Sequence, residues 1–236
     1  MSKKALNQNS KYVQELIDFI EPNFIFNDKP INRLKTLSHD TSEDKIKKLQ
    51  KLRNKIYSIK NCKIKDNSKN IVMGDGYVDS SLMLIGETPG EIEDLSGYSF
   101  DGEIGSLLKK MLLAIGIDRE KVYTTYSINF RPPSDRKPTS QEIKRYSLFL
   151  KEHILIINPK LIVLMGSTAM EAVTGLNTKI SDERGDWKEI ILNNKTFPLM
   201  ISFSPSYLIR YPDNKKYSWE DLKKIRKKIS DLNITI

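Results

Sequence analysis

Apolar residues recur at helical spacing early in the chain and later form short continuous runs separated by polar loops. The spacing over residues 13–20 predicts a helix that ends at Pro22, and residues 42–58 predict a second helix. The later runs predict strands, which cover residues 81–86, 121–128, 160–166, 187–192 and 196–203.

Helical segments separate most of these runs and cover residues 103–115, 140–156, 167–175 and a last stretch from about residue 217. Thr139 and Glu142 have the spacing of a capping box, which places the start of the long middle helix. Strands that alternate with helices predict an α/β fold with a mainly parallel sheet and helices on both faces, preceded by a helical extension.

The composition is that of one sizeable core, because 39% of the 236 residues are hydrophobic. We expect residues 1–58 to form a helical extension packed on the same domain as residues 59–236. No apolar run reaches the roughly 18 residues that a membrane-spanning helix needs, and the first residues lack the apolar stretch of a secretory signal. These features predict a cytosolic (cytoplasmic) protein with no membrane partner.

The formal net charge of +9 favours a polyanionic partner such as nucleic acid. Residues 43–70 hold ten Lys or Arg against three acids, a local net charge of +7, and residues 215–230 form a second basic segment. For residues 43–70, the structural alternative is a solvated helix face. The sequence alone does not show whether the two segments converge on one site.

The loops that follow the predicted parallel strands carry the candidate chemistry, because ligands bind at the carboxyl ends of such strands. These loops cover residues 86–102, 129–138, 166–168 and 204–210. The chain has neither a G-x-G-x-x-G turn nor a G-x-x-x-x-G-K-[ST] loop, which argues against a nucleotide-driven enzyme. An acid near a flat ring, as with Glu87 and Phe100, suits a site that holds a planar group and directs water at it. An acidic turn with Phe100 packed in the core is the structural alternative.

Four segments carry a resemblance to a known family: "GETPGEIEDLSGYSFDG", "VYTTYSINFRPPSDRKPTSQEI", "NPKLIVLMGSTA" and "SPSYLIRYPDNKKYSWEDLKKI". In order and spacing, from about residue 55 to 228, they resemble the type-4 uracil-DNA glycosylases. The resemblance implies a three-layer α/β/α sandwich with a mainly parallel central sheet of about four strands. It also implies a DNA repair enzyme that flips uracil, or another deaminated base, out of DNA and hydrolyses its N-glycosidic bond.

The resemblance assigns roles to the first of these segments. Glu87 matches the catalytic acid, next to Gly86 and Thr88, whose backbone helps to hold the base and position water. Phe100 matches the ring that stacks on uracil. Glu93 matches the side chain that crowds the C5 position of the base and rejects thymine.

The last segment matches the loop that enters DNA, with Leu208 and Arg210 at the minor-groove wedge. Arg131 and Ser167 are further candidates, for phosphate contacts. A rigid turn explains Arg131 as well, and a helix cap explains Ser167 as well. The DNA-binding candidates are thus Pro205, Ser206, Leu208, Arg210, Arg131 and Ser167.

Two residues depart from the family pattern. Ser204 stands where the family has a histidine that donates to the uracil oxygen, and loss of such a donor typically costs about 10²–10³ in rate. Tyr126 stands where the family reads the base with an asparagine. A tyrosine cannot reproduce a two-point amide contact, so it narrows the pocket, changes the accepted base or fills its space.

The resemblance also implies an iron–sulfur cluster held by cysteines at positions that are here Ile59, Cys62, Phe130 and Tyr146. A cluster needs about four thiolates, and Cys62 is the only cysteine of the chain. We therefore expect no cofactor and no metal, with an apolar plug in place of the cluster.

Two functions stay open. One is a monofunctional, hydrolytic DNA glycosylase with reduced or altered activity, which the acids and the ring at their matched places favour. The other is a catalytically impaired DNA-binding or lesion-recognition protein on the same scaffold. In either case we expect a monomer whose partner is DNA that contains uracil or another deaminated base.

Overall fold

The computed structural model describes residues 40–236, so the helix expected over residues 13–20 lies outside the described chain. The helices are α2 (Ser42–Tyr57), α3 (Lys63–Asn67), α4 (Glu91–Ser96), α5 (Gly102–Leu113), α6 (Ser140–Ile157), α7 (Ser167–Thr174), α8 (Ile180–Glu183), α9 (Pro205–Arg210) and α10 (Lys215–Asp231). The strands are β1 (Asp75–Gly76), β2 (Leu82–Gly86), β3 (Tyr123–Tyr126), β4 (Leu161–Met165), β5 (Trp187–Leu192) and β6 (Lys195–Ser202).

One six-stranded sheet has the order β1-β3-β2-β4-β6-β5. Its central strands β3, β2, β4 and β6 are parallel, as expected, and β1 and β5 add an antiparallel strand at each edge. The edge at β5 arises because Asn193 and Asn194 both adopt positive φ, which closes a two-residue hairpin between β5 and β6. The sheet of about four strands that the family resemblance implies therefore corresponds to the four parallel strands at its centre.

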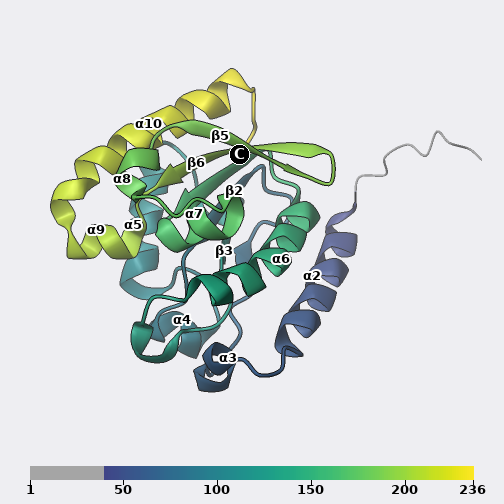
Figure 1. The fold of residues 1–236 in the computed structure, drawn as a ribbon. Coiled ribbons are helices and arrows are strands. Elements are labelled where there is room, and N and C mark those ends of the chain that lie inside the picture. The colour runs from purple at the N-terminus through teal and green to yellow at the C-terminus, as the bar shows by residue number, and fades with distance from the viewer. Residues whose placement is uncertain (1–39) are drawn as a thin grey trace, which may run out of the picture. The chain divides into compact units, whose positions relative to one another are not determined.

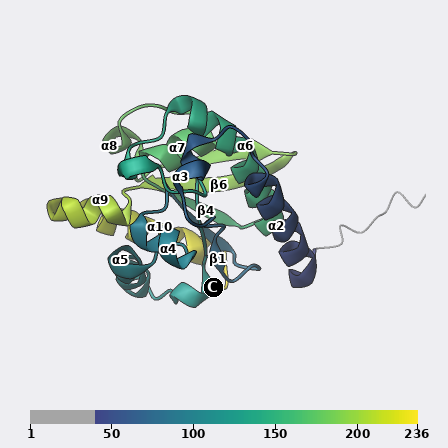
Figure 2. The same ribbon diagram turned by 90° about the horizontal axis from the view of Figure 1, so that it is seen from below.

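Alternate side chains of the central strands enter two separate cores, because successive strand residues point to opposite faces. In β2, Met83 and Ile85 belong to one core, and Leu82 and Leu84 belong to the other. Residues of α2, α6 and α7 line the first core, and residues of α5, α9 and α10 line the second. Figures 1 and 2 show the resulting layers, with the sheet between two sets of helices. The predicted α/β sandwich is confirmed.

Helix α6 begins where the sequence predicts, at the capping box. The Thr139 hydroxyl accepts from the backbone N–H of Glu142, and the Glu142 carboxylate accepts from the backbone N–H of Thr139. Helix α2 matches the expected helix over residues 42–58 and has a capping box of its own.

Helix α2 of the first basic segment and helix α10 of the second lie in different layers. Helix α2 packs on α6, whereas α10 packs on α5 and β6 on the opposite face of the sheet (Figure 1). Within residues 40–236, no helix is both long enough and apolar enough to cross a bilayer.

Residues 204–210, expected as a loop, contain a short helix instead. Ser204 is the N-cap of α9, and Pro205 occupies its first turn. Serine at the N-cap followed by proline is a start signal for a helix, because proline lacks only an N–H that would have no partner there. Residues 204 and 205 therefore carry a local signal for a helix where the strand pattern predicts a loop.

Candidate functional site

A cavity of about 510 Å³ lies at the carboxyl ends of the parallel strands. It is of the size that binds small ligands. Most of the predicted site residues line it: Gly86, Glu87, Thr88, Phe100, Tyr126, Ser167, Ser204, Pro205, Ser206 and Arg210. Glu93, Leu208 and Arg131 do not line it.

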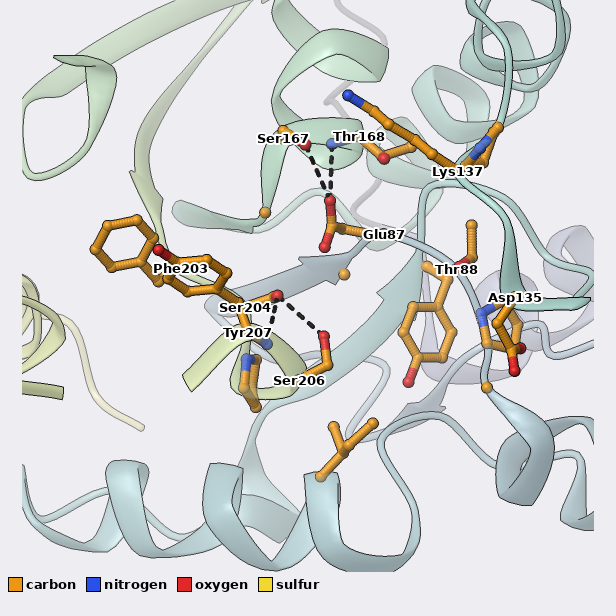
Figure 3. Close-up of a pocket in the computed structure, with 18 of the residues that line it drawn as sticks. Glu87, Thr88, Asp135, Lys137, Ser167, Thr168, Phe203, Ser204, Ser206 and Tyr207 are labelled. Carbon is orange, nitrogen blue, oxygen red and sulfur yellow. Dashed lines mark hydrogen bonds between the residues drawn. The ribbon is translucent and has the colours of Figure 1, made fainter. Parts of the chain in front are cut away.

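Glu87 is fixed at this cavity by the first turn of α7. Its Oε1 accepts from the backbone N–H of Thr168 at 3.1 Å and from the Ser167 hydroxyl at 3.2 Å. Figure 3 shows both bonds, with Phe203 and Ser204 on one side of the carboxylate and Thr88 on the other. These donors leave Oε2 without a hydrogen-bond partner among residues 40–236, so it is available to a ligand or water.

Gly166 permits this arrangement. Its φ is +109°, and a Cβ atom there would lie 2.3 Å from the Glu87 carboxyl carbon. Any other residue would push the carboxylate away and strain the backbone. The "GST" segment thus holds Glu87 through Ser167 and Thr168, which is a different role from the phosphate contact expected for Ser167.

The Tyr126 side chain is buried beside Phe100. The two rings are stacked with their centroids 4.9 Å apart. The Tyr126 hydroxyl donates to Glu93 Oε1 at 2.9 Å and accepts from the backbone N–H of Phe100 at 3.1 Å. Burial, and then the Glu93 carboxylate, hold the pKa of this hydroxyl well above its ordinary value, so it remains a neutral donor. Tyr126 therefore covers one face of the ring that was expected to stack on a base.

The expected role of Glu93 is corrected by its contacts. Glu93 is 1% exposed, and its Oε2 accepts from the backbone N–H of Gly90 while Oε1 binds Tyr126. Both oxygens are thus engaged behind the cavity wall. Glu93 holds Tyr126 and the start of α4 instead of facing the C5 position of a base.

Ser204 has a structural task as well as a place in the cavity wall. Its Oγ lies 3.3 Å from the backbone N of Tyr207, which donates to it, and 3.0 Å from the Ser206 Oγ. Ser204 therefore caps α9 and anchors the loop. A hydroxyl in this position can still donate one hydrogen bond toward the cavity.

The structure corrects the wedge assignment. Leu208 is 1% exposed and packs in the core that α5 and α10 share, so it does not protrude toward DNA. Because Leu208 and Arg210 are two residues apart in helix α9, their side chains point in different directions. Arg210 is exposed and lines the cavity.

The assignment of Arg131 as a phosphate contact is also corrected. Its Nε and Nη2 bind the two Asp135 oxygens at 2.7 and 2.9 Å, and Glu91 lies 3.8 Å from Nη1. The hydrogen bonds with Asp135 raise the pKa of Arg131 and lower that of Asp135, which marks a mutually satisfied pair. Arg131 stabilises the turn after β3. A partner phosphate would have to compete with two carboxylates.

Several residues of the site were missed by sequence reasoning. Lys137 is exposed and lines the cavity without an ion pair among residues 40–236, so it is a better phosphate candidate than Arg131. Thr168 holds Glu87 through its backbone. Phe203 and Tyr207 stack on each other at the wall, with centroids 4.9 Å apart. Lys137 lies in the predicted rim loop 129–138. Phe203 precedes the N-cap of α9, so the helical spacing rule does not predict its contact with Tyr207.

The residues at the expected cluster positions meet in one apolar core. Ile59, Cys62, Phe130 and Tyr146 all pack there, with the Cys62 Sγ 3.3 Å from the Tyr146 hydroxyl and the Phe130 and Tyr146 rings edge to face. This donor set does not fit an iron–sulfur cluster, because it offers one thiol. Within residues 40–236, no group of three His, Cys, Asp or Glu side chains could hold a metal ion.

The model of the uracil DNA glycosylase superfamily matches residues 73–225. A type-4 uracil-DNA glycosylase of Thermotoga maritima is 38% identical over 70% of this chain and 86% of the relative. The type-4 uracil-DNA glycosylase of Sulfurisphaera tokodaii is 34% identical over 75% of this chain and 83% of the relative. That of Archaeoglobus fulgidus is 32% identical over 72% of this chain and 87% of the relative.

Proposed function

Because the chain belongs to the uracil DNA glycosylase superfamily, we propose that it is a monofunctional DNA glycosylase. It hydrolyses the N-glycosidic bond of uracil, or of another deaminated base, in DNA. We propose that it acts as a monomer, since residues of one chain line the cavity. We also propose that it acts in the cytosol. The observation that carries the proposal is the fixed carboxylate of Glu87 at the rim where a flipped nucleotide would enter.

The chemistry follows from how Glu87 is held. With Oε1 bound by two donors of α7, Oε2 accepts a hydrogen bond from water and orients it toward the sugar carbon. The electron pair of the glycosidic bond leaves with the base, and the water oxygen bonds to the sugar carbon. Glu87 takes the proton that this water loses.

The base-binding half of the pocket supports reduced or altered activity. Ser204 offers one uncharged donor and spends its oxygen on the cap of α9. Tyr126 covers one face of Phe100 and leaves less room for a planar base. Both features raise the barrier, because the departing anion is less well stabilised and less well held.

A second candidate function has its own support. Tyr126 hydrogen-bonds to Glu93 and to the backbone of Phe100 and stacks on the Phe100 ring, all without a ligand. Such contacts are expected if the tyrosine side chain occupies space that a base would otherwise take. A catalytically impaired protein that binds DNA or recognises lesions fits this observation. Arg210 and Lys137 would then hold DNA without excision.

An oligonucleotide assay separates the two functions. We expect the purified protein to release base from uracil-containing single- or double-stranded oligonucleotides, detected as strand cleavage after alkali. Parallel arms with hypoxanthine and xanthine report an altered base preference. DNA binding that weakens with added salt, with no product in any arm, would reject the enzyme and favour the binding protein.

We also propose that the protein carries no iron–sulfur cluster. The expected result is purified protein without the visible absorbance of such a cluster and with negligible iron per chain by metal analysis. The physical reason is the single thiol of Cys62 among apolar and phenolic neighbours. Stoichiometric iron in protein purified without air would contradict this.

A further inference from the structure

An aromatic column, formed by Phe203, Tyr207 and Tyr211, runs from the cavity to the surface. The centroid distance is 4.9 Å between Phe203 and Tyr207 and 4.8 Å between Tyr207 and Tyr211. Phe203 and Tyr207 line the cavity, and Figure 3 shows them next to Ser204. Phe203 lies just before the N-cap of α9, Tyr207 lies in its first turn and Tyr211 is its C-cap, so this short helix and its flanks carry the three rings.

The inner end of the column is held rigidly. The Arg184 guanidinium lies 5.4 Å from the ring centroids of both Phe203 and Tyr217. Arg184 is fixed in turn by hydrogen bonds to the buried carboxylate of Asp221. The Tyr207 hydroxyl accepts from the Asn214 side chain at 3.2 Å. The column is therefore ordered before any ligand arrives.

The outer end of the column has an open face. Tyr211 is 55% exposed, although the Tyr207 ring contacts it at a tilt of 39°. Arg210 precedes Tyr211 directly, and Lys215 follows it by four residues. Both cations are exposed, and neither forms an ion pair within residues 40–236. An open aromatic face beside unpaired cations suits the base and the phosphate of a nucleotide.

We propose that Tyr211 is a stacking platform for an unpaired base of the DNA strand, adjacent to the nucleotide held in the cavity. This inference rests on the proposed function only in taking DNA as the ligand. The base adds one more layer to the aromatic column, and Arg210 neutralises the phosphate between it and the cavity. A stacked base is recognised by its flat face, so the contact is tolerant of sequence.

Binding of Tyr211→Ala to a single-stranded oligonucleotide tests the platform. The probe is a strand with one 2′-fluoro-2′-deoxyuridine, which resists excision. We expect Tyr211→Ala to weaken its affinity about 5- to 150-fold, the range for one base–aromatic stack. Tyr211→Phe keeps the ring and should bind as the natural chain does. Tyr77→Ala is the matched control, since Tyr77 is 53% exposed and lies outside the cavity wall.

A second strand separates stacking from other causes. Its nucleotides on both sides of the fluorinated uridine lack bases, so Tyr211→Ala and the natural chain should bind it equally. Unchanged affinity of Tyr211→Ala for the first strand would overturn the inference, and so would an equal loss on both strands. The result is independent of excision: a natural chain that releases no base refutes the enzyme, while the platform is judged by binding alone.

Discussion

We expect the double variant Ser204→His/Tyr126→Asn to release uracil about 10²–10³-fold faster than the natural chain. The histidine supplies a donor to the base oxygen as negative charge builds on it. The asparagine offers an amide donor and acceptor to the base edge, and loss of the tyrosine ring frees the covered face of Phe100. The measurement is the single-turnover rate on a single-stranded uracil oligonucleotide, read after alkali.

Each single variant should gain less than the double variant. Ser204→His leaves the Tyr126 ring on Phe100, and Tyr126→Asn leaves the departing base without the stronger donor. The loss of the cap at Ser204 costs about 1 kcal/mol of stability, which thermal unfolding will report. Ser206→His is the matched control, because it adds the same side chain to the same cavity wall two residues along. A folded double variant with an unchanged rate would show that these two positions do not limit the reaction.

Glu87→Gln should lower the single-turnover rate about 10²–10⁴-fold, the usual contribution of a general base. The amide oxygen can still accept from Thr168 and Ser167, so the loop keeps its position. It cannot take a proton from water. DNA affinity should hold or increase, because one negative charge facing a polyanion is removed.

Glu91→Gln is the control for this effect. Glu91 lies four residues along, its side chain is 70% exposed, and its nearest cation, Arg131, is 3.8 Å away. Both variants are best measured also in the Ser204→His/Tyr126→Asn background, where the rate is higher. If Glu87→Gln keeps the full rate in both backgrounds, Glu87 is not the group that activates water.

Much of the fold was predictable because its signals are local. Buried parallel strands appear as short apolar runs, and the capping box at Thr139 marks the start of α6 through two adjacent hydrogen bonds. The short helix α9 also had a local signal, at Ser204 and Pro205, which was assigned to a loop. The hairpin between β5 and β6 also had a local sequence signal, the adjacent asparagines Asn193 and Asn194.

The candidate site was predictable only as a set of loops. The rule that ligands bind at the carboxyl ends of parallel strands brought together Glu87, Phe100 and Ser204 before their geometry was known. The rule does not say which way each side chain points. Leu208 and Glu93 were placed in the site by their matched positions, yet packing turns both away from the cavity.

The sequence by itself determined the order of the strands along the chain, the rim on which the chemistry lies, and the presence of Ser204, Tyr126 and a single thiol. Those properties depend on residue identity and local spacing. Only the tertiary structure decided that Tyr126 covers Phe100 and binds Glu93, and that the basic helices α2 and α10 lie on opposite faces of the sheet. Such contacts join residues far apart in the chain, so they depend on how whole elements pack and not on any local pattern.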